Sequence, residues 1–349
     1  MNDYSFLDQI LHRIILGSSL INEFLFDLEC SSYGETKESE LNRRPVFVSG
    51  LARAGTTVLM RALYASGQFA SLTYDDMPFV MAPNLWQKMT ARNKKARVKS
   101  ERAHGDGIEV DFDSPEALEE VFWRTFHGKE YIKKKSLCPH EFTSETLAAF
   151  ETYQDLVCKK YAKDRYLSKN NNQVLRLKTL SRHCKNATIL VPFRDPLEHA
   201  KSLLTQHSKF SKSSSFTKIY MRLLAHHEFG ATHRPFVFDK GQAITGDSNT
   251  LDYWLDRWCQ YYQFILEFLE QKPENVMLVS YQRLCREPSY WQEICKFVDI
   301  PVTVPANFSA PPASQCPPVS NERVESAKAI FSRLEQIVSA KIDSASTSA

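Results

Sequence analysis

A short loop of small and hydroxyl-bearing residues has the composition of a site for a phosphate group. It follows an apolar run and reads Gly50-Leu51-Ala52-Arg53-Ala54-Gly55-Thr56-Thr57. A loop that leads from a strand into a helix exposes backbone N–H groups and the positive end of the helix dipole, which together bind anions. The residue types therefore predict an anion-binding site. The alternative is an ordinary strand–turn–helix with incidental threonines.

The spacing of the two glycines matches a nucleotide-binding loop, but the cation stands elsewhere. Gly50 and Gly55 are separated as in the Walker A pattern, in which a lysine follows the second glycine. Thr56 occupies that position here, and the loop's own cation is Arg53. Without the lysine, the loop lacks the charge that contacts the β- and γ-phosphates of a nucleoside triphosphate. This difference argues against a nucleoside triphosphatase.

A second anion site is indicated later in the chain, where an arginine ends an apolar run. Arg194 follows Leu190-Val191-Pro192-Phe193, and Ser202 comes eight residues after it. The planar guanidinium of arginine binds phosphate oxygens through parallel hydrogen bonds. A hydroxyl two helical turns further on can contact the same anion if its helix packs beside the site. The alternative is a local ion pair between Arg194 and Asp195, with Ser202 facing solvent.

Three apolar runs and the helices between them would position these groups. The runs predict buried strands over 45–50, 187–193 and 275–280, although Pro192 is unusual within a central strand. Strands separated by long helices predict an α/β fold, with a mostly parallel sheet flanked by helices on both faces. The helical patterns lie over 57–65, 114–126, 144–163, 196–204 and 251–271, with an N-terminal amphipathic helix over 4–29 and a C-terminal helix over 321–342.

The bulk composition is that of a folded, soluble protein. The chain has 349 residues, of which 43% are hydrophobic, and its net charge of +3 is too small to indicate nucleic acid as the main partner. No apolar run approaches the roughly 18 residues that span a bilayer, and no secretory signal is recognisable. We expect a cytoplasmic protein with a helix and linker (1–44), an α/β domain (45–300), and a Pro-rich loop with a final helix and frayed tail (301–349).

Both anion sites resemble motifs of the sulfotransferase superfamily. Arg53-Ala54-Gly55-Thr56-Thr57 resembles its loop for the 5′-phosphosulfate of 3′-phosphoadenosine 5′-phosphosulfate (PAPS). Arg194 and Ser202 resemble, at the same spacing, the pair that binds the 3′-phosphate. The two motifs stand in the family order. The resemblance covers about residues 45–300 and is closer to the bacterial and Golgi-type branches, both carbohydrate and tyrosylprotein, than to the phenol-type enzymes.

Two flanking segments extend the resemblance. Lys169-Asn170 resembles a Lys-Asn-Pro segment of the carbohydrate and tyrosylprotein branches, with Asn171 in place of the proline. Tyr281 stands where relatives have a tyrosine near the adenine, although the acidic pair that follows it there is Gln-Arg in this chain.

The resemblance implies a P-loop-like sheet and sulfonate transfer from PAPS to a hydroxyl or amine. The acceptor would be a carbohydrate or small metabolite, and the nucleotide product would be adenosine 3′,5′-bisphosphate (PAP). Arg53 would stabilise the charge that builds on the leaving group, and Lys169 would be a second cation at the sulfonate. The scheme requires no metal. Two other functions stay open, a P-loop small-molecule kinase and a catalytically inactive nucleotide-binding protein.

The acceptor also needs a general base within hydrogen-bond reach, and three positions are candidates. Asp76, next to Asp75, lies about where the tyrosylprotein branch has its acidic catalytic pair. His104 lies in a glycine-containing loop suited to a lid, and histidine titrates near neutral pH. Glu120 follows Glu119 on a predicted helix. We rank them in that order; the alternatives are a turn cap, a surface histidine and a solvated helix face.

Overall fold

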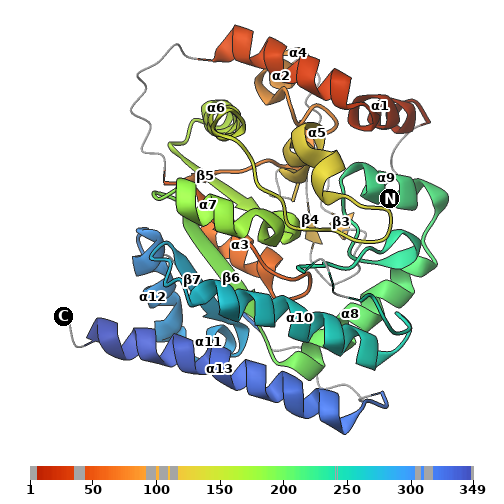
Figure 1. The fold of residues 1–349 in the computed structure, drawn as a ribbon. Coiled ribbons are helices and arrows are strands. Elements are labelled where there is room, and N and C mark those ends of the chain that lie inside the picture. The colour runs from red at the N-terminus through yellow and green to blue at the C-terminus, as the bar shows by residue number, and fades with distance from the viewer. Residues whose placement is uncertain are drawn as a thin grey trace.

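A five-stranded parallel sheet forms the centre of the protein (Figure 1). The computed structural model describes residues 6–34, 44–91, 100–101, 109–110, 117–239, 241, 243–302, 308–309 and 317–346. Within these residues the strand order is β2-β5-β1-β6-β7, and each neighbouring pair is parallel. The bounds are β1 Val46–Val48, β2 Phe69–Ala70, β5 Arg165–Lys169, β6 Thr188–Phe193 and β7 Val276–Ser280. Two short strands, β3 Ser100–Glu101 and β4 Glu109–Val110, form a separate antiparallel pair.

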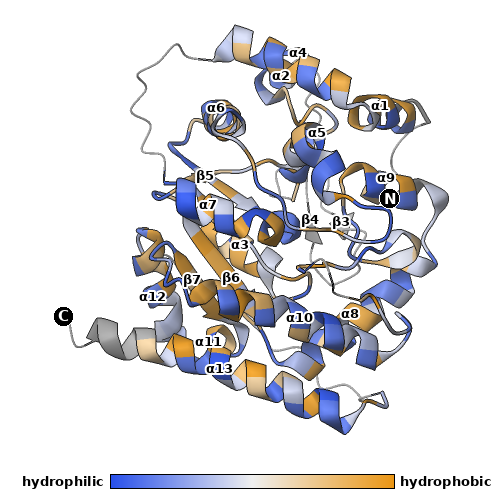
Figure 2. Cartoon of the chain, viewed as in Figure 1, coloured by the Kyte–Doolittle hydropathy of each residue, from blue (hydrophilic) through white to orange (hydrophobic). Residues whose placement is uncertain are grey.

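Helices flank the sheet on both faces, as the alternation of strand and helix patterns predicted. In Figure 2 the strands β6 and β7 are almost wholly apolar, whereas the surrounding helices carry both polar and apolar residues. This difference is expected for strands that are covered on both faces and for helices that are covered on one. The helices are α1 Phe6–Gly17, α2 Ser19–Tyr33, α3 Thr56–Tyr64, α4 Pro83–Thr90, α5 Glu120–Tyr131, α6 Ser144–Tyr161, α7 Leu177–His183, α8 Pro196–Ser211, α9 Ser215–Leu223, α10 Leu251–Leu269, α11 Tyr281–Arg286, α12 Pro288–Val298 and α13 Asn321–Ser346.

The central strand β1 ends where the connections of the sheet diverge. Its last residue, Val48, lies opposite Lys169 of β5 and Leu190 of β6. After β1 the chain crosses to β2, on the β5 side, whereas after β6 it crosses to β7 on the other side. Neighbouring parallel strands whose connections leave in opposite directions open a crevice at their carboxyl ends, which is where ligands bind in open α/β sheets. The two predicted anion sites follow these two strands.

Pro192 is compatible with a central strand because its partner strand has already ended. The Leu190 carbonyl accepts from Ser49 N at 2.9 Å, so residues 190 and 192 direct their backbone groups toward β1. At the level of Pro192, β1 has turned into the loop, so no ladder bond is lost. The Pro192 carbonyl instead accepts from the Tyr262 hydroxyl at 2.9 Å.

The terminal helices differ in detail from the prediction. The single helix expected over 4–29 is two helices, because the Ser18 side chain accepts from Ile21 N and caps the start of α2. At the other end, α13 packs along α10, where Arg323 Nε donates to Asp256 at 2.8 Å.

None of the described helices is long and apolar enough to cross a membrane.

Other elements were also not predicted correctly, among them one helix start and one strand. The helix expected from residue 114 begins at Glu120 instead, and β5 was not recognised as a strand. The first residue of β5, Arg165, is buried and donates to three carbonyl oxygens, which belong to Arg44, Val298 and Asp299. This strand start is therefore stabilised by contacts that are distant in the sequence, and local apolar spacing does not reveal it.

Candidate active site

The loop after β1 has a backbone that few residue types adopt without strain. Gly55 has a φ of 92° and Arg53 a φ of 71°, both in the left-handed region. That region costs a residue with a side chain roughly 1–2 kcal/mol, and such strain is concentrated at functional sites. A Cβ atom on Gly55 would lie 2.4 Å from the Tyr281 ring, and one on Gly50 would lie 2.6 Å from the Thr56 side chain. Both glycines are thus required by close contacts.

A buried histidine supports this loop from α8. His199 is fully buried, and its Nε2 lies 2.7 Å from the Ala52 carbonyl oxygen. A carbonyl only accepts, so this nitrogen carries the proton. Burial, reinforced by the nearby Arg194, lowers the pKa of His199 to about 3. The ring is therefore neutral at physiological pH and acts as a fixed donor to the loop.

Four of the predicted binding residues, from four separate segments of the chain, meet at the crevice. Arg53 Nε donates to the Ser202 hydroxyl at 3.0 Å, and Arg194 Nη1 donates to the Arg53 carbonyl oxygen at 3.3 Å. Tyr281 begins α11 directly after β7, and its ring centre lies 5.8 Å from the Arg194 guanidinium carbon. The residues that were predicted to bind the two ends of a nucleotide therefore lie side by side and form one continuous surface.

The crevice has donors suited to an anion. Arg194 is 8% exposed, and its Nε has no hydrogen-bond partner among the described residues. Burial lowers the pKa of Arg194, although Tyr281 and nearby acidic residues oppose this shift. Gly55, the N-cap of α3, has no side chain to cap the helix, so no N-cap side chain competes with a ligand for the backbone N–H groups of the first turn. A buried cation and these amides together favour a bound phosphate.

Lys169 lies beside a carboxylate that sequence reasoning missed. Lys169 is the last residue of β5, and its positive charge lowers the pKa of Glu228. The Asn171 side chain donates to Glu228 Oε1 at 2.8 Å. Burial raises the pKa of Glu228, but His226, the hydrogen bond from Asn171 and Lys169 outweigh it, so the net shift is downward. Glu228 is therefore ionised at neutral pH.

Glu228 is also open to the crevice. It lines a pocket together with Leu51 and Ala52 of the loop after β1. No motif marks Glu228 in the sequence. The only available signal was the run His226-His227-Glu228, in which three titratable residues are adjacent.

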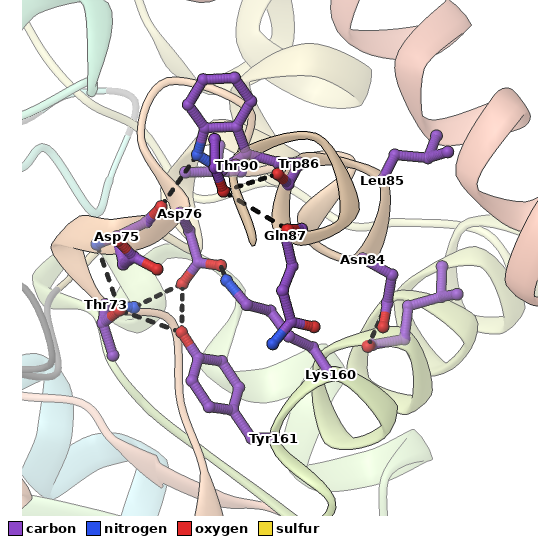
Figure 3. Close-up of polar contacts among 12 residues, drawn as sticks. Thr73, Asp75, Asp76, Asn84, Leu85, Trp86, Gln87, Thr90, Lys160 and Tyr161 are labelled. Atoms are coloured by element: carbon purple, nitrogen blue, oxygen red, sulfur yellow. Dashed lines mark hydrogen bonds and ion pairs between the residues drawn. The ribbon is translucent and has the colours of Figure 1, made fainter. Parts of the chain in front are cut away.

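Asp76, the first-ranked candidate base, is enclosed by the protein (Figure 3). Its side chain is fully buried, and Lys160 Nζ lies 2.5 Å from Oδ1. The Tyr161 hydroxyl and the Thr73 backbone N–H donate to Oδ2, both at 2.7 Å. Thr73 and Asp76 together form a capping box at a short 3₁₀ turn, Tyr74–Asp76. Both oxygens are engaged by the fold, so we interpret Asp76 as a residue that holds this turn against α6.

Glu120, the third-ranked candidate, is also enclosed by the protein. Glu120 is buried and accepts from Arg176 Nη2 at 2.5 Å and from Asn170 Nδ2 at 2.6 Å. The Arg176 guanidinium lies over the Trp123 ring at 4.5 Å. Glu120 is thus part of a buried ion pair rather than of a solvated helix face. His104 lies outside the described residues.

Comparisons with known proteins identify the fold and the family. A model of the sulfotransferase family matches residues 45–304. The structure is similar to that of a sulfotransferase from Mycobacterium tuberculosis H37Rv, with a TM-score of 0.50 at 14% identity, covering 93% of this chain and 81% of the other. A sulfotransferase from Mycobacterium avium matches with a TM-score of 0.50 at 13% identity, covering 95% and 79%. At such identities these structures show the shared fold alone. Among curated protein sequences, no match is found.

Proposed function

The chain belongs to the sulfotransferase family, and we propose that it transfers a sulfonate group from PAPS to a hydroxyl or amine of a small acceptor. The observation that carries the choice of donor is the meeting of Arg53, Arg194 and Ser202 beside the helix-opening loop. These groups would bind the 5′-phosphosulfate and the 3′-phosphate of one adenosine nucleotide at the same time. A nucleoside triphosphate would instead need the cation that Thr56 replaces.

The residues of the crevice divide between the two ends of the donor. Arg53 and the first-turn amides of α3 bind the 5′-phosphosulfate, where Arg53 stabilises the charge left on the phosphate as the bond to sulfur breaks. Arg194 and Ser202 bind the 3′-phosphate. Tyr281, between Gly55 and Arg194, offers a ring face to the adenine.

Glu228 is the base that this geometry supports best. Its carboxylate is ionised and lines the pocket beside the loop, whereas the carboxylate of Asp76 is used within the fold. Glu228 takes the proton of the acceptor hydroxyl while the acceptor oxygen forms a bond to sulfur, and the bond from sulfur to the bridging oxygen of the donor breaks. Lys169, next to Glu228, stabilises the sulfonate oxygens. The products are the sulfated acceptor and PAP.

Product release distinguishes this reaction from the alternatives. The protein is incubated with one panel of phenol, sugar and amine acceptors, once with PAPS and once with ATP plus Mg²⁺. We expect acceptor-dependent release of PAP and none of ADP. Release of ADP alone would indicate a small-molecule kinase, and binding of PAP without turnover would indicate an inactive nucleotide-binding protein.

A separate variant tests the assignment of Glu228 as the general base. Glu228→Gln should lower kcat by about 100- to 10,000-fold, the usual effect of losing a general base, while PAP binds as before. Glu270→Gln, at an exposed position at the end of α10, is the matched control. A Glu228→Gln enzyme with unchanged kcat would exclude this role.

A further inference from the structure

A single arginine interrupts the aromatic face of α10. Trp254, Arg257 and Tyr261 are spaced by three and four residues, so they share the buried side of this helix. Arg257 is 7% exposed, and its guanidinium carbon lies 5.0 Å from the centre of the Tyr253 ring. A charge placed among aromatic side chains is costly unless it is paired.

No carboxylate of the described residues forms an ion pair with this charge. Nε and Nη1 of Arg257 have no hydrogen-bond partner there. The neighbouring carboxylates of α10, Asp252 and Asp256, are both paired with Arg323 of α13, and Asp256 acts on Arg257 only through its charge. Arg257 therefore has donors to spare, and a Tyr ring is a poor substitute for an anion.

Arg257 lines the same pocket as Glu228, at the edge of the loop after β1. The wall of the pocket is mostly apolar, and it combines residues from the loop, α8, the 228–238 segment and α10: Ala52, Leu203, Glu228, Phe236, Trp254 and Arg257. An aromatic wall with a few polar groups is the usual character of a small-molecule site. The lining of the pocket is therefore suited to contact with an organic acceptor, and the loop that would hold the donor forms one side of it.

We propose that the acceptor is a small organic acid, in which an aromatic or apolar body carries the reacting hydroxyl and an anionic group that binds Arg257. This inference rests on the proposed sulfotransfer, because Glu228 would receive the hydroxyl end. The nearby Lys169 balances the negative charge of Glu228, and the Asn171 side chain donates a hydrogen bond to it, which weakens its repulsion of the anion. A second arginine, Arg234, adds positive charge to the pocket wall.

Three phenols that share the 4-hydroxyphenyl ring and differ in charge test the preference. They are 4-hydroxyphenylacetate, which is an anion, 4-methylphenol, which is neutral, and tyramine, which is a cation. Each is titrated by calorimetry into the protein, with and without saturating PAP. A charged hydrogen bond of ordinary strength should make the anion bind at least about tenfold more tightly than the neutral phenol. Tyramine should bind the weakest of the three.

Arg257→Met retains the length and apolar body of the side chain and removes only its donors. In this variant the anion should lose about tenfold in affinity, while 4-methylphenol changes little. Arg257→Lys should restore part of the preference, and Arg222→Met, at an exposed position on α9, is the surface control. Wild-type binding of the anion that is absent or no tighter than that of the neutral phenol overturns the proposal, as does a preference that survives Arg257→Met. Failure to bind PAP contradicts the proposed function instead, because the probe preference is also measured without nucleotide.

Discussion

Replacing Asp76 by asparagine separates a structural role of this residue from a catalytic one. Asp76 is fully buried, and the Lys160 side chain that pairs with it is 3% exposed. The substitution keeps the size of the side chain but removes its charge, so the Lys160 ammonium is left without its counter-ion. The amide nitrogen also replaces one of two acceptor oxygens, of which Oδ2 accepts from Thr73 and Tyr161 and Oδ1 accepts from Lys160.

Breaking a buried ion pair from one side typically costs about 3–5 kcal/mol. That loss is large against the roughly 5–15 kcal/mol that stabilise a folded domain, yet a folded population should remain at low temperature. Because neither Asp76 oxygen is presented to an acceptor, kcat per folded molecule should stay close to that of the wild type. If Asp76 were the general base, kcat would fall by about 100- to 10,000-fold.

Urea unfolding and steady-state kinetics, both well below the melting temperature, provide the assay. Asp75→Asn, at the half-buried neighbouring position, is the matched control and should cost about 1 kcal/mol or less. The double variant Asp76→Asn with Lys160→Met should be destabilised by less than the sum of the two single changes, because the pair is removed together. An Asp76→Asn protein of wild-type stability whose kcat has collapsed would refute this reasoning and restore Asp76 as the base.

Two further predictions concern the loop that binds the donor. Gly55→Ala should weaken PAP binding by at least about tenfold in calorimetry, because the added Cβ overlaps the Tyr281 ring and the φ of 92° disfavours a side chain; unchanged affinity would show that the loop adapts. His199 has a pKa of about 3 when folded, so it contributes stability above its unfolded pKa of about 6.5 and loses it as the pH falls toward 3. Between these values the loss should be about 1.4 kcal/mol per pH unit, and urea titrations of His199→Gln should lack that component; an identical pH dependence in the variant would contradict it.

The strands that could be predicted from the sequence are those whose own residues are continuously apolar. Val46 to Val48 and the run ending at Phe193 are buried on both faces, and each leads into a site residue. Their neighbour β5 has few apolar residues, and its start is held by carbonyl groups from residues 44, 298 and 299 that only the folded chain brings near. Local patterns could not have revealed it.

The same distinction separates the site residues. Arg53, Arg194 and Ser202 stand in motifs with fixed spacing, and the fold brings them into contact. The two carboxylates have no such signature. Whether Asp76 faces a substrate or a lysine is decided by Lys160 on a distant helix, and the place of Glu228 in the pocket is decided by tertiary packing around its loop.

Thermal stability with PAP is the most direct test of the central claim, which is that the crevice binds the bisphosphate of a sulfonate donor. At a PAP concentration of 100 times Kd, the wild-type protein should gain about 2.7 kcal/mol of apparent stability. Arg194→Ala should lose this gain, Arg286→Ala at an exposed position should keep it, and ATP plus Mg²⁺ should not reproduce it. Stabilisation by ATP plus Mg²⁺ alone, or a PAP effect that is unchanged in Arg194→Ala, would contradict the account.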